Sequence, residues 1–259
     1  MNRWQWRGER VLVTGGAQGI GEAVVTALLA EGRQVMVWDR DKRALDGLSE
    51  RHAGAGLQVA EVDMAQWQEL APRVAELEAC WGPIDYLVNV AGVLAMASAL
   101  SLTPEQWLHS FAVNTHGPFF LSQAVGGRMA ARGGGAIVTV GSNAGRTPRV
   151  QMAAYGASKA ATLSWMRTLG LELAGQGVRC NLVSPGSTDT RMQRQLWQDE
   201  SGPARVIEGS LADYRLGIPL GRLCQPAQVA DAVLFLLSEQ AAQITLHDLR
   251  VDGGATLDQ

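Results

Sequence analysis

Three side chains between positions 142 and 159 could together remove a proton from an alcohol. Ser142 offers a hydroxyl, Tyr155 a phenol and Lys159 an ammonium group. Tyr155 and Lys159 are four residues apart, so a helix would place them on one face, about one turn from each other. A phenol, with a pKa of about 10, is a weak base at neutral pH, but a close ammonium favours the phenolate and lowers that pKa. The spacing therefore predicts Tyr155 as a general base, with Ser142 holding the substrate oxygen.

The scarcity of lysine favours a specific role for Lys159. Only two of the 22 basic residues are lysines, Lys42 and Lys159. An isolated Tyr-x-x-x-Lys would indicate only a half-buried helical tyrosine and a solvated lysine, because short motifs recur by chance. Catalysis is therefore indicated only together with the motifs elsewhere in the chain.

The composition is that of a globular protein and gives no sign of nucleic-acid or membrane binding. The 259 residues are 47% hydrophobic and 18% charged and carry a net charge of −3, so we expect no basic surface for nucleic acid or an anionic membrane. The three cysteines lack C-x-x-C spacing, and the four histidines lack metal-binding spacing. No apolar run approaches the roughly 20 residues that span a bilayer, and the N-terminal stretch lacks the apolar core of a signal peptide. We therefore expect a cytoplasmic protein without a metal site.

The N-terminal segment predicts a loop that holds a dinucleotide phosphate. Residues 10–16 have the pattern of a strand that runs into glycine, and residues 19–32 have the apolar period of a helix. Between them, T-G-x-x-x-G-x-G lets the backbone turn tightly and approach a pyrophosphate, whose charge the helix N-terminus favours. The predicted contacts of this loop are Gly15, Gln18, Gly19, Ile20 and Gly21.

The predicted second strand, residues 34–39, ends in an aspartate that would select the cofactor. Asp39 can accept hydrogen bonds from both adenosine ribose hydroxyls and would repel a 2′-phosphate, which favours NAD over NADP. Two alternatives remain open. Arg40 could hold such a phosphate, and Asp39 could be a plain N-cap or turn residue.

Further cofactor contacts are predicted where the next two strands end. In the third strand, residues 57–64, Asp63 and Met64 would touch the adenine edge, or Asp63 would cap the helix at 66–80. The fourth strand, residues 84–92, ends in a turn of small residues that packs beneath the ribose or only stabilises the sheet. The contacts predicted in that turn are Asn89, Ala91 and Gly92.

Two long helices and a strand frame the catalytic segment. A helix predicted over 104–132 carries Asn114, a polar residue among apolar neighbours that must find a partner. A strand at 136–140 precedes Ser142, and the helix that carries Tyr155 continues to Ala174.

The predicted sixth strand, residues 178–186, ends in Pro185-Gly186. Backbone groups there, with the hydroxyls of Thr188 and Thr190, could bind an amide. The alternative is that Thr188 or Asp189 caps a helix.

The end of the chain completes the fold prediction. Residues 190–216 are predicted to form a helical insertion with a Gly-Pro break at 202–203, mobile enough to act as a lid. A helix over 226–238 and a strand within 244–254 follow. Six strand–helix alternations and a last strand predict a single-domain Rossmann fold, with a doubly wound seven-stranded parallel sheet and helices on both faces.

In this order, the motifs resemble the short-chain dehydrogenase/reductase family over the whole chain. They are Thr14-Gly15-x-x-x-Gly19-x-Gly21, Asn89-Val90-Ala91-Gly92, Asn114, Ser142, Tyr155-x-x-x-Lys159 and Pro185-Gly186. One departure is Val90, where the family more often has a second asparagine. The resemblance implies a catalytic tetrad of Asn114, Ser142, Tyr155 and Lys159.

The resemblance also implies roles for individual residues. Asn114 would hold a water near Lys159 for proton relay, and Lys159 would also grip the nicotinamide ribose. Thr188 and Thr190 match the positions that hold the carboxamide. The family resemblance further implies a homotetramer, in which the long helices at 104–132 and 151–174 pair across one interface.

Blocks in the second half resemble family members that oxidise a dihydrodiol carboxylic acid to an aromatic product. Examples are GGAIVTV at 134–140 and LGIPLG at 216–221. Asn143 departs from the aspartate expected there, which leaves open a hydroxyl or an amine on the ring. The remaining alternatives are an NADPH-dependent ketone or acyl-thioester reductase and a catalytically silent dinucleotide-binding scaffold.

A small aromatic-acid precursor needs a cation for its carboxylate, which the tetrad does not supply. Arg149, in the loop entering the catalytic helix, is the first candidate because a guanidinium can grip a carboxylate through two hydrogen bonds. Arg146 and Arg194 follow, although these arginines could instead lie on the surface or pair within an oligomer. Further predicted substrate contacts, which could also merely pack the insertion, are Met192, Leu196 and Trp197.

Overall fold

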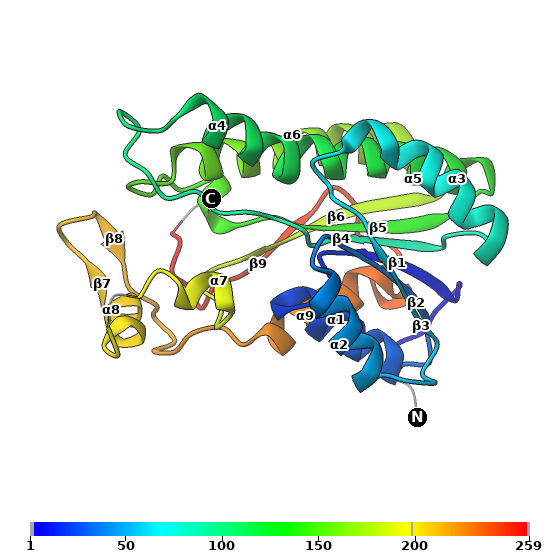
Figure 1. Cartoon of the computed structure of the whole chain (residues 1–259), viewed down its shortest axis with the longest axis horizontal. Coiled ribbons are helices and arrows are strands. Elements are labelled where there is room, and N and C mark those ends of the chain that lie inside the picture. Colours follow the sequence, from blue (N-terminus) through cyan, green and yellow to red (C-terminus); the bar gives the residue numbers. More distant parts are fainter. Residues whose placement is uncertain (1–2, 198, 258–259) are drawn as a thin grey trace.

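Seven strands form one parallel sheet in the order β3-β2-β1-β4-β5-β6-β9 (Figure 1). The computed structural model describes residues 3–197 and 199–257. In chain order the strands of this sheet are β1 (Arg10–Thr14), β2 (Gln34–Asp39), β3 (Leu57–Glu61), β4 (Tyr86–Asn89), β5 (Gly135–Val140), β6 (Val178–Pro185) and β9 (Asp248–Val251). The predicted single-domain, doubly wound parallel sheet is confirmed.

Alternation along the strands divides the hydrophobic core into two. In β1, Val11 and Val13 belong to the core on one face of the sheet and Leu12 to the core on the other, and all three are fully buried. Successive side chains of a strand point to opposite faces. A parallel sheet covered on both faces therefore needs strands that are apolar throughout, which is why these segments are continuous apolar runs in the sequence.

Helices cover both faces of the sheet in Figure 1. α1 packs against α9 on one face, and α5 packs against α3 and α6 on the other. The first layer contains α1 (Gly19–Ala30), α2 (Lys42–Arg51) and α9 (Pro226–Leu237). The second contains α3 (Leu70–Trp81), α4 (Pro104–Phe111), α5 (Gly117–Ala131) and α6 (Ala153–Ala174). No helix in the described part of the chain has both the length and the apolar character needed to cross a bilayer.

The carboxyl ends of the central strands lie at one edge of the sheet. Thr14 at the end of β1 pairs with Trp38 in β2 and with Asn89 in β4. Asn89 in turn pairs with Thr139 in β5. The strand order reverses between β1 and β4, and open α/β sheets bind ligands at that point, outside the carboxyl ends.

The helix predicted over 104–132 is interrupted at its middle. α4 ends at Phe111, residues Ala112–His116 form a π-helical turn, η2, and α5 begins at Gly117. Asn114 lies in this turn, where its side chain bonds the backbone of Val93. A π turn inserts one residue into a helix and often marks a functional site. The helical apolar spacing of residues 104–132 does not reveal this turn.

The predicted insertion folds as two short helices and a hairpin. α7 (Arg191–Arg194) and α8 (Gly202–Glu208) precede the antiparallel strands β7 (Gly209–Ser210) and β8 (Arg215–Leu216). The Gly-Pro pair at 202–203 begins α8, because proline is tolerated in the first turn of a helix. Figure 1 shows these elements beyond one end of the sheet. The sequence predicts no hairpin here, since its strands are only two residues long. Movement of this segment as a lid stays a prediction.

Candidate active site

The structure brings Ser142, Tyr155 and Lys159 together at the carboxyl end of β5. Ser142 begins the short turn η3 (Asn143–Gly145), where its Oγ accepts a hydrogen bond from the N–H of Ala144 at 3.1 Å. Tyr155 lies in the first turn of α6, and its phenol is hydrogen-bonded to Ser142. The Nζ atom of Lys159 lies 5.9 Å from the centre of the Tyr155 ring. The spacing in the sequence therefore does bring the hydroxyl, the phenol and the ammonium into one site.

Burial governs the ionisation of this site. It lowers the pKa of Lys159 from 10.5 to about 8, and Nζ donates a hydrogen bond to the carbonyl oxygen of Val140 at 2.9 Å. The pKa of Tyr155 is raised, because burial of the phenol outweighs the hydrogen bond with Ser142. The expectation that Lys159 lowers the pKa of Tyr155 is thus wrong for this arrangement. The loss of hydration acts on both groups, and the ammonium is directed to a carbonyl.

Asn114 connects the loop after β4 to the catalytic helix. Its Oδ1 accepts from the N–H of Val93 at 2.8 Å, while its Nδ2 donates to the carbonyl of Val93 at 2.9 Å and to Ser158 Oγ at 3.0 Å. A Cβ built on Gly92 would lie 3.3 Å from Asn114 Oδ1 and 3.6 Å from Lys159 Nζ, which places these two side chains near each other. The water relay through Asn114 stays a prediction.

The glycine-rich loop keeps its backbone open to a ligand. Gly15 has a φ of +65°, and a Cβ there would lie 2.6 Å from both N and Cα of Ala91. Gly19 has a φ of +60° and begins α1. A Cβ on Gly19 would lie 3.4 Å from the side chain of Thr190, the nearest residue. A side chain on Gly21 would meet the carbonyl of Gly15. A loop whose glycines leave the backbone accessible at a helix N-terminus fits the pyrophosphate of a dinucleotide.

Asp39 ends β2 with its carboxylate fixed against that loop. Oδ2 accepts a hydrogen bond from the N–H of Ala17 at 3.1 Å and Oδ1 from the N–H of Asp41 at 3.0 Å, and Asp39 is only 8% exposed. The N-cap of α2 is Asp41, whose side chain accepts from the N–H of Ala44, so the N-cap alternative for Asp39 is wrong, whereas the hydrogen bond from the N–H of Asp41 makes Asp39 a residue of the turn before α2. Arg40 is exposed. A fixed, nearly buried anion suits a neutral ribose better than a phosphate.

Asn89 stabilises the end of the sheet. Its Nδ2 donates to Ser122 Oγ at 2.9 Å and to Thr139 Oγ1 at 3.0 Å. Thr14 supports the same turn, because its Oγ1 accepts from the N–H of Val90 at 3.2 Å. The structural alternative for Asn89 is therefore realised, and a contact with the cofactor stays a prediction.

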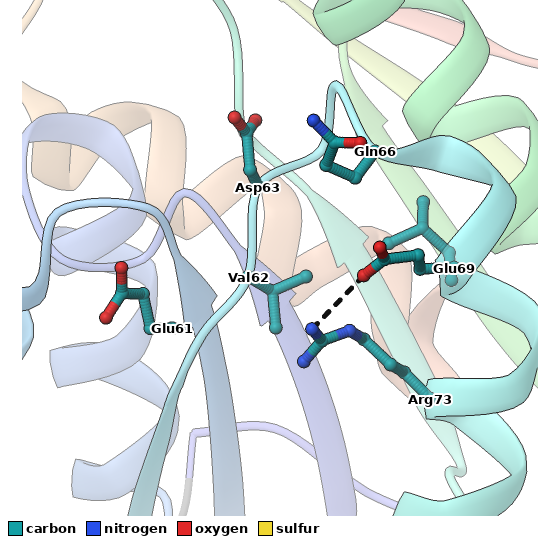
Figure 2. A pocket seen from close by; sticks show the side chains of 7 residues that line it. Glu61, Val62, Asp63, Gln66, Glu69 and Arg73 are labelled. Carbon is teal, nitrogen blue, oxygen red and sulfur yellow. Dashed lines mark hydrogen bonds and ion pairs between the residues drawn. The ribbon is translucent and has the colours of Figure 1, made fainter.

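Asp63 stands at the rim of a hollow beside the edge strand β3 (Figure 2). Its Oδ1 accepts from the N–H of Ala65 at 2.9 Å, and Figure 2 shows its carboxylate pointing away from the ion pair between Glu69 and Arg73. Met64, next to Asp63, is buried in the core. Within the described chain no group of acidic, histidine or cysteine side chains could hold a metal ion, here or elsewhere. The hollow contains no tetrad residue and is not the reaction site. Its lining consists of Glu61, Val62, Asp63, Gln66, Glu69, Leu70 and Arg73.

The loop after β6 borders the glycine-rich loop. Thr188 is buried and donates to the carbonyl of Gly186 at 3.2 Å. Thr190 caps α7 by accepting from the N–H of Gln193 at 3.3 Å, so the helix cap is neither Thr188 nor its neighbour at 189. Thr190 also lies beside Gly19. Thr190 therefore stands close to the predicted cofactor groove, and a contact of either threonine with the carboxamide stays a prediction.

Of the three candidate carboxylate ligands, two are committed to ion pairs. Arg146 Nε lies 3.1 Å from Oδ2 of the buried Asp248. Arg194 donates to the two carboxylate oxygens of Asp189 at 2.6 and 3.0 Å. Arg149 is half-buried, and its guanidinium has no ion pair or hydrogen bond within residues 3–197 and 199–257. Arg149 is thus the candidate that keeps its donors available.

The predicted ring contacts of the insertion differ in their surroundings. Met192 is exposed and Leu196 is half-buried. Trp197 packs against Gly202, so for Trp197 the alternative of packing the insertion is realised. Trp197 also contacts a small third core, whose buried members are Val206, Ile218, Leu223 and Ala255.

Two residues near the site have no signal in the sequence motifs. Arg215 in β8 donates from Nη2 to Ser187 Oγ at 2.8 Å, in the loop after β6. Asp252 accepts from Nδ2 of Asn143 at 3.3 Å. An aspartate at position 143 would bring a second carboxylate beside Asp252, which gives a physical reason for the amide there. Neither contact follows from local spacing, because each joins segments far apart in the chain.

Comparison with known proteins agrees with this geometry. Residues 15–256 match the family model described as Enoyl-(Acyl carrier protein) reductase. The chain is 47% identical, over 259 residues and 99% of both chains, to the 2,3-dihydro-2,3-dihydroxybenzoate dehydrogenase of Bacillus subtilis (strain 168). It is 46% identical to the vibriobactin-specific 2,3-dihydro-2,3-dihydroxybenzoate dehydrogenase of Vibrio cholerae serotype O1, with 96% of each chain covered.

Solved structures share the fold over nearly the whole chain. The crystal structure of gox2181 gives a TM-score of 0.87 at 33% identity and covers 96% of both chains. An oxidoreductase of the short chain dehydrogenase/reductase family from Burkholderia thailandensis gives a TM-score of 0.84, also at 33% identity, and covers 95% of this chain and 92% of its own.

Proposed function

The chain belongs to the short-chain dehydrogenase/reductase family, and from this premise we propose that it oxidises trans-2,3-dihydro-2,3-dihydroxybenzoate to 2,3-dihydroxybenzoate with NAD. The relatives from Bacillus subtilis and Vibrio cholerae are named for this activity, and this chain matches both of them over nearly their whole length. The vibriobactin-specific name of the second supports a place in the biosynthesis of a catechol siderophore. The observation that carries the proposal is the convergence of Ser142, Tyr155 and Lys159 beside the glycine-rich loop.

The residues at the end of β5 would act on the ring alcohol. Ser142 holds the hydroxyl oxygen, and Tyr155 accepts the hydroxyl proton as the C–H bond breaks. Lys159 takes part in the same proton transfer. Asn114 holds α6, the helix that carries Tyr155 and Lys159, through its hydrogen bond to Ser158. Bound NAD supplies the acceptor for the hydride. The dienone product tautomerises to a phenol, and this aromatisation makes oxidation the favoured direction.

The cofactor would lie along the carboxyl edge of the sheet. Gly15, Gly19 and Gly21 leave room for the pyrophosphate, and Asp39 accepts from the ribose hydroxyls. The loop after β6, with Thr188 and Thr190, would hold the carboxamide. The buried carboxylate of Asp39 supports NAD rather than NADP, and so speaks against an NADPH-dependent reductase.

A second candidate substrate is trans-2,3-dihydro-3-hydroxyanthranilate, which carries an amine in place of a hydroxyl. Asn143, next to Ser142, is the observation that keeps it open. Its Nδ2 donates to Asp252 and to Thr256 Oγ1, the latter at 3.0 Å, so Oδ1 remains to accept a hydrogen bond from either substituent. Turnover of the two acids, compared side by side, decides between them.

We also propose that the protein is a cytoplasmic homotetramer. An apolar groove between α5 and α6 supports the assembly, because Phe119, Trp165 and Leu169 line it. A Cβ on Gly127 in the same groove would meet no atom within 4 Å, so Gly127→Arg should fit the isolated chain but block assembly across this face. Sedimentation velocity should show a smaller species for Gly127→Arg than for the wild type. A wild type that sediments as a monomer would contradict the tetramer.

The activity itself is tested with purified protein, NAD and the dihydrodiol acid. NADH absorbance and the fluorescence of the catechol acid should rise together. Tyr155→Phe should reduce kcat by about 10²- to 10⁴-fold while NAD still binds, since only the proton acceptor is lost. Retained NAD binding without turnover in this variant would also exclude a silent scaffold. A wild type that turns over neither dihydro acid would overturn the proposed function.

A further inference from the structure

We propose that Arg215 and Arg149 together bind the carboxylate of the substrate, with Arg215 reaching the site from the β7–β8 hairpin. This inference rests on the proposed function, because it assumes that the substrate is a ring acid. Arg149 enters from the loop between η3 and α6, and Arg215 from β8, more than 60 residues later in the chain. Two guanidinium groups from separate segments would then hold the two oxygens of one anion.

Arg215 is attached to the active-site loop rather than extended into solvent. It is half-buried, and its Nη2 donates to Ser187 Oγ at 2.8 Å. Ser187 directly follows Pro185-Gly186 at the carboxyl end of β6. The bond to Ser187 uses one of the five N–H groups of a guanidinium, so the others remain to bind an anion.

The loop that holds Arg215 is packed against the catalytic turn. A Cβ on Gly186 would lie 2.6 Å from Cβ of Asp252 and 3.4 Å from Nδ2 of Asn143. Asn143 directly follows Ser142. The short path from Ser187 through Gly186 to Asn143 therefore sets Arg215 on the same side of the site as the hydroxyl that would hold the substrate oxygen.

The charges of the two arginines favour an anion between them. The pKa of Arg149 is lowered, mainly by burial. The nearby positive charge of Arg215 lowers it further, whereas Asp252 opposes both effects. Burial also lowers the pKa of Arg215, against the opposing effect of Asp213. Neither guanidinium has an ion pair in the described part of the chain. The carboxylate of Asp252 already accepts from Asn143 and from the N–H of Gly254 at 3.0 Å. Two half-buried cations without a paired anion would be stabilised by a bound carboxylate.

A merely structural role for Arg215 is the alternative, in which its bond to Ser187 fastens the hairpin. Other bonds already hold this segment, since the N–H of Ile218 donates to the carbonyl of Ile207 at 2.8 Å. A serine hydroxyl also needs no positive charge as its partner. A fastening role therefore does not account for a half-buried cation at this position.

The test compares substrates with and without the carboxylate. KM and kcat are measured with NAD for the dihydrodiol acid and for the carboxyl-free trans-dihydrodiol, in the wild type, Arg215→Gln, Arg215→Lys and Arg149→Gln. Arg205→Gln is the matched control, because Arg205 lies in the same insertion but is exposed and paired with Asp199. Arg215→Gln and Arg149→Gln should each raise KM for the acid roughly 10- to 100-fold and leave KM for the carboxyl-free diol unchanged. Arg215→Lys should recover part of the loss, and Arg205→Gln should match the wild type.

The outcomes separate the failure of this inference from the failure of the proposed function. If the wild type oxidises the acid and Arg215→Gln has the same KM for it, the clamp is wrong and the function stands. If KM rises equally for both substrates, Arg215 only fastens the hairpin. A wild type that turns over the carboxyl-free diol as efficiently as the acid removes the clamp without any variant. A wild type inactive on both dihydro acids would instead remove the proposed function.

Discussion

Lys159 lies one helical turn from Tyr155, with Nζ 5.9 Å from the ring centre, yet donates its hydrogen bond to the carbonyl of Val140. The two side chains are therefore neighbours that share one buried environment. Burial moves their pKa values apart, since it lowers that of Lys159 from 10.5 to about 8 and raises that of Tyr155 from its ordinary value of 10. Of the two groups, Lys159 therefore loses its proton first as the pH rises.

Oxidation should accordingly rise with pH through an apparent pKa of about 8. Below that pH Lys159 is charged and Tyr155 is protonated, so the pair cannot accept the proton of the alcohol. Above it one proton has left the pair, and kcat/KM for the dihydrodiol acid should level off. Lys159→Met should move the rise to higher pH, because only the phenol with its raised pKa remains. A flat profile between pH 6 and 9, or the same profile in Lys159→Met, would contradict this assignment.

Gly15 should not tolerate a side chain, whereas Gly175 should. Gly15 combines a φ of +65° with backbone atoms of Ala91 2.6 Å from a Cβ, so Gly15→Ala should destabilise the fold by about 2 kcal/mol and weaken NAD binding. Gly175 has a φ of −64° and no atom within 4 Å of a Cβ. Gly175→Ala should change stability by less than about 1 kcal/mol and leave NAD binding intact. Urea denaturation and NAD titration of both variants check this, and equal behaviour of the two would show that the loop can adapt.

The sequence was sufficient for the features that depend on local pattern. The strand predicted at 34–39 is β2, Gln34–Asp39, because a buried parallel strand must be apolar until a polar residue ends it. The convergence of Ser142, Tyr155 and Lys159 follows in the same way from a strand end and a helical spacing. These rules connect residues that are close in the chain.

Contacts between distant segments could not be predicted. The π turn at Asn114 depends on bonds to Val93, and the place of Arg215 depends on a two-residue hairpin and on Ser187. The direction of the pKa change at Tyr155 also could not be predicted from the sequence. Spacing shows that an ammonium is near, but not how deeply the phenol is buried or which group the ammonium faces.

Lys159 should lower the stability of the fold at neutral pH. Its pKa is 10.5 when unfolded and about 8 when folded, so the folded state disfavours the charged form. This destabilisation is fully present below pH 8 and disappears as the pH rises through 10.5. Relative to Lys159→Met, the wild type should therefore gain about 2 kcal/mol of unfolding free energy between pH 7 and 9.5. Urea denaturation of both proteins at the two pH values measures this. A difference that does not change with pH would mean that the ammonium is well solvated.

Asp39 should determine the choice between NAD and NADP. Its carboxylate is fixed by hydrogen bonds from the N–H groups of Ala17 and Asp41. It therefore cannot rotate away from a 2′-phosphate, which it would repel. Asp39→Asn removes the charge and keeps the size. The preference for NAD, expressed as the ratio of kcat/KM values for the two cofactors, should fall about tenfold or more, because hydrogen bonds to a charged group contribute about 1.5–3 kcal/mol. Asp46→Asn is the control, since Asp46 is an exposed residue of α2 that pairs with Lys42. If Asp39→Asn keeps the ratio of the wild type, the carboxylate does not contact the ribose and another residue selects the cofactor.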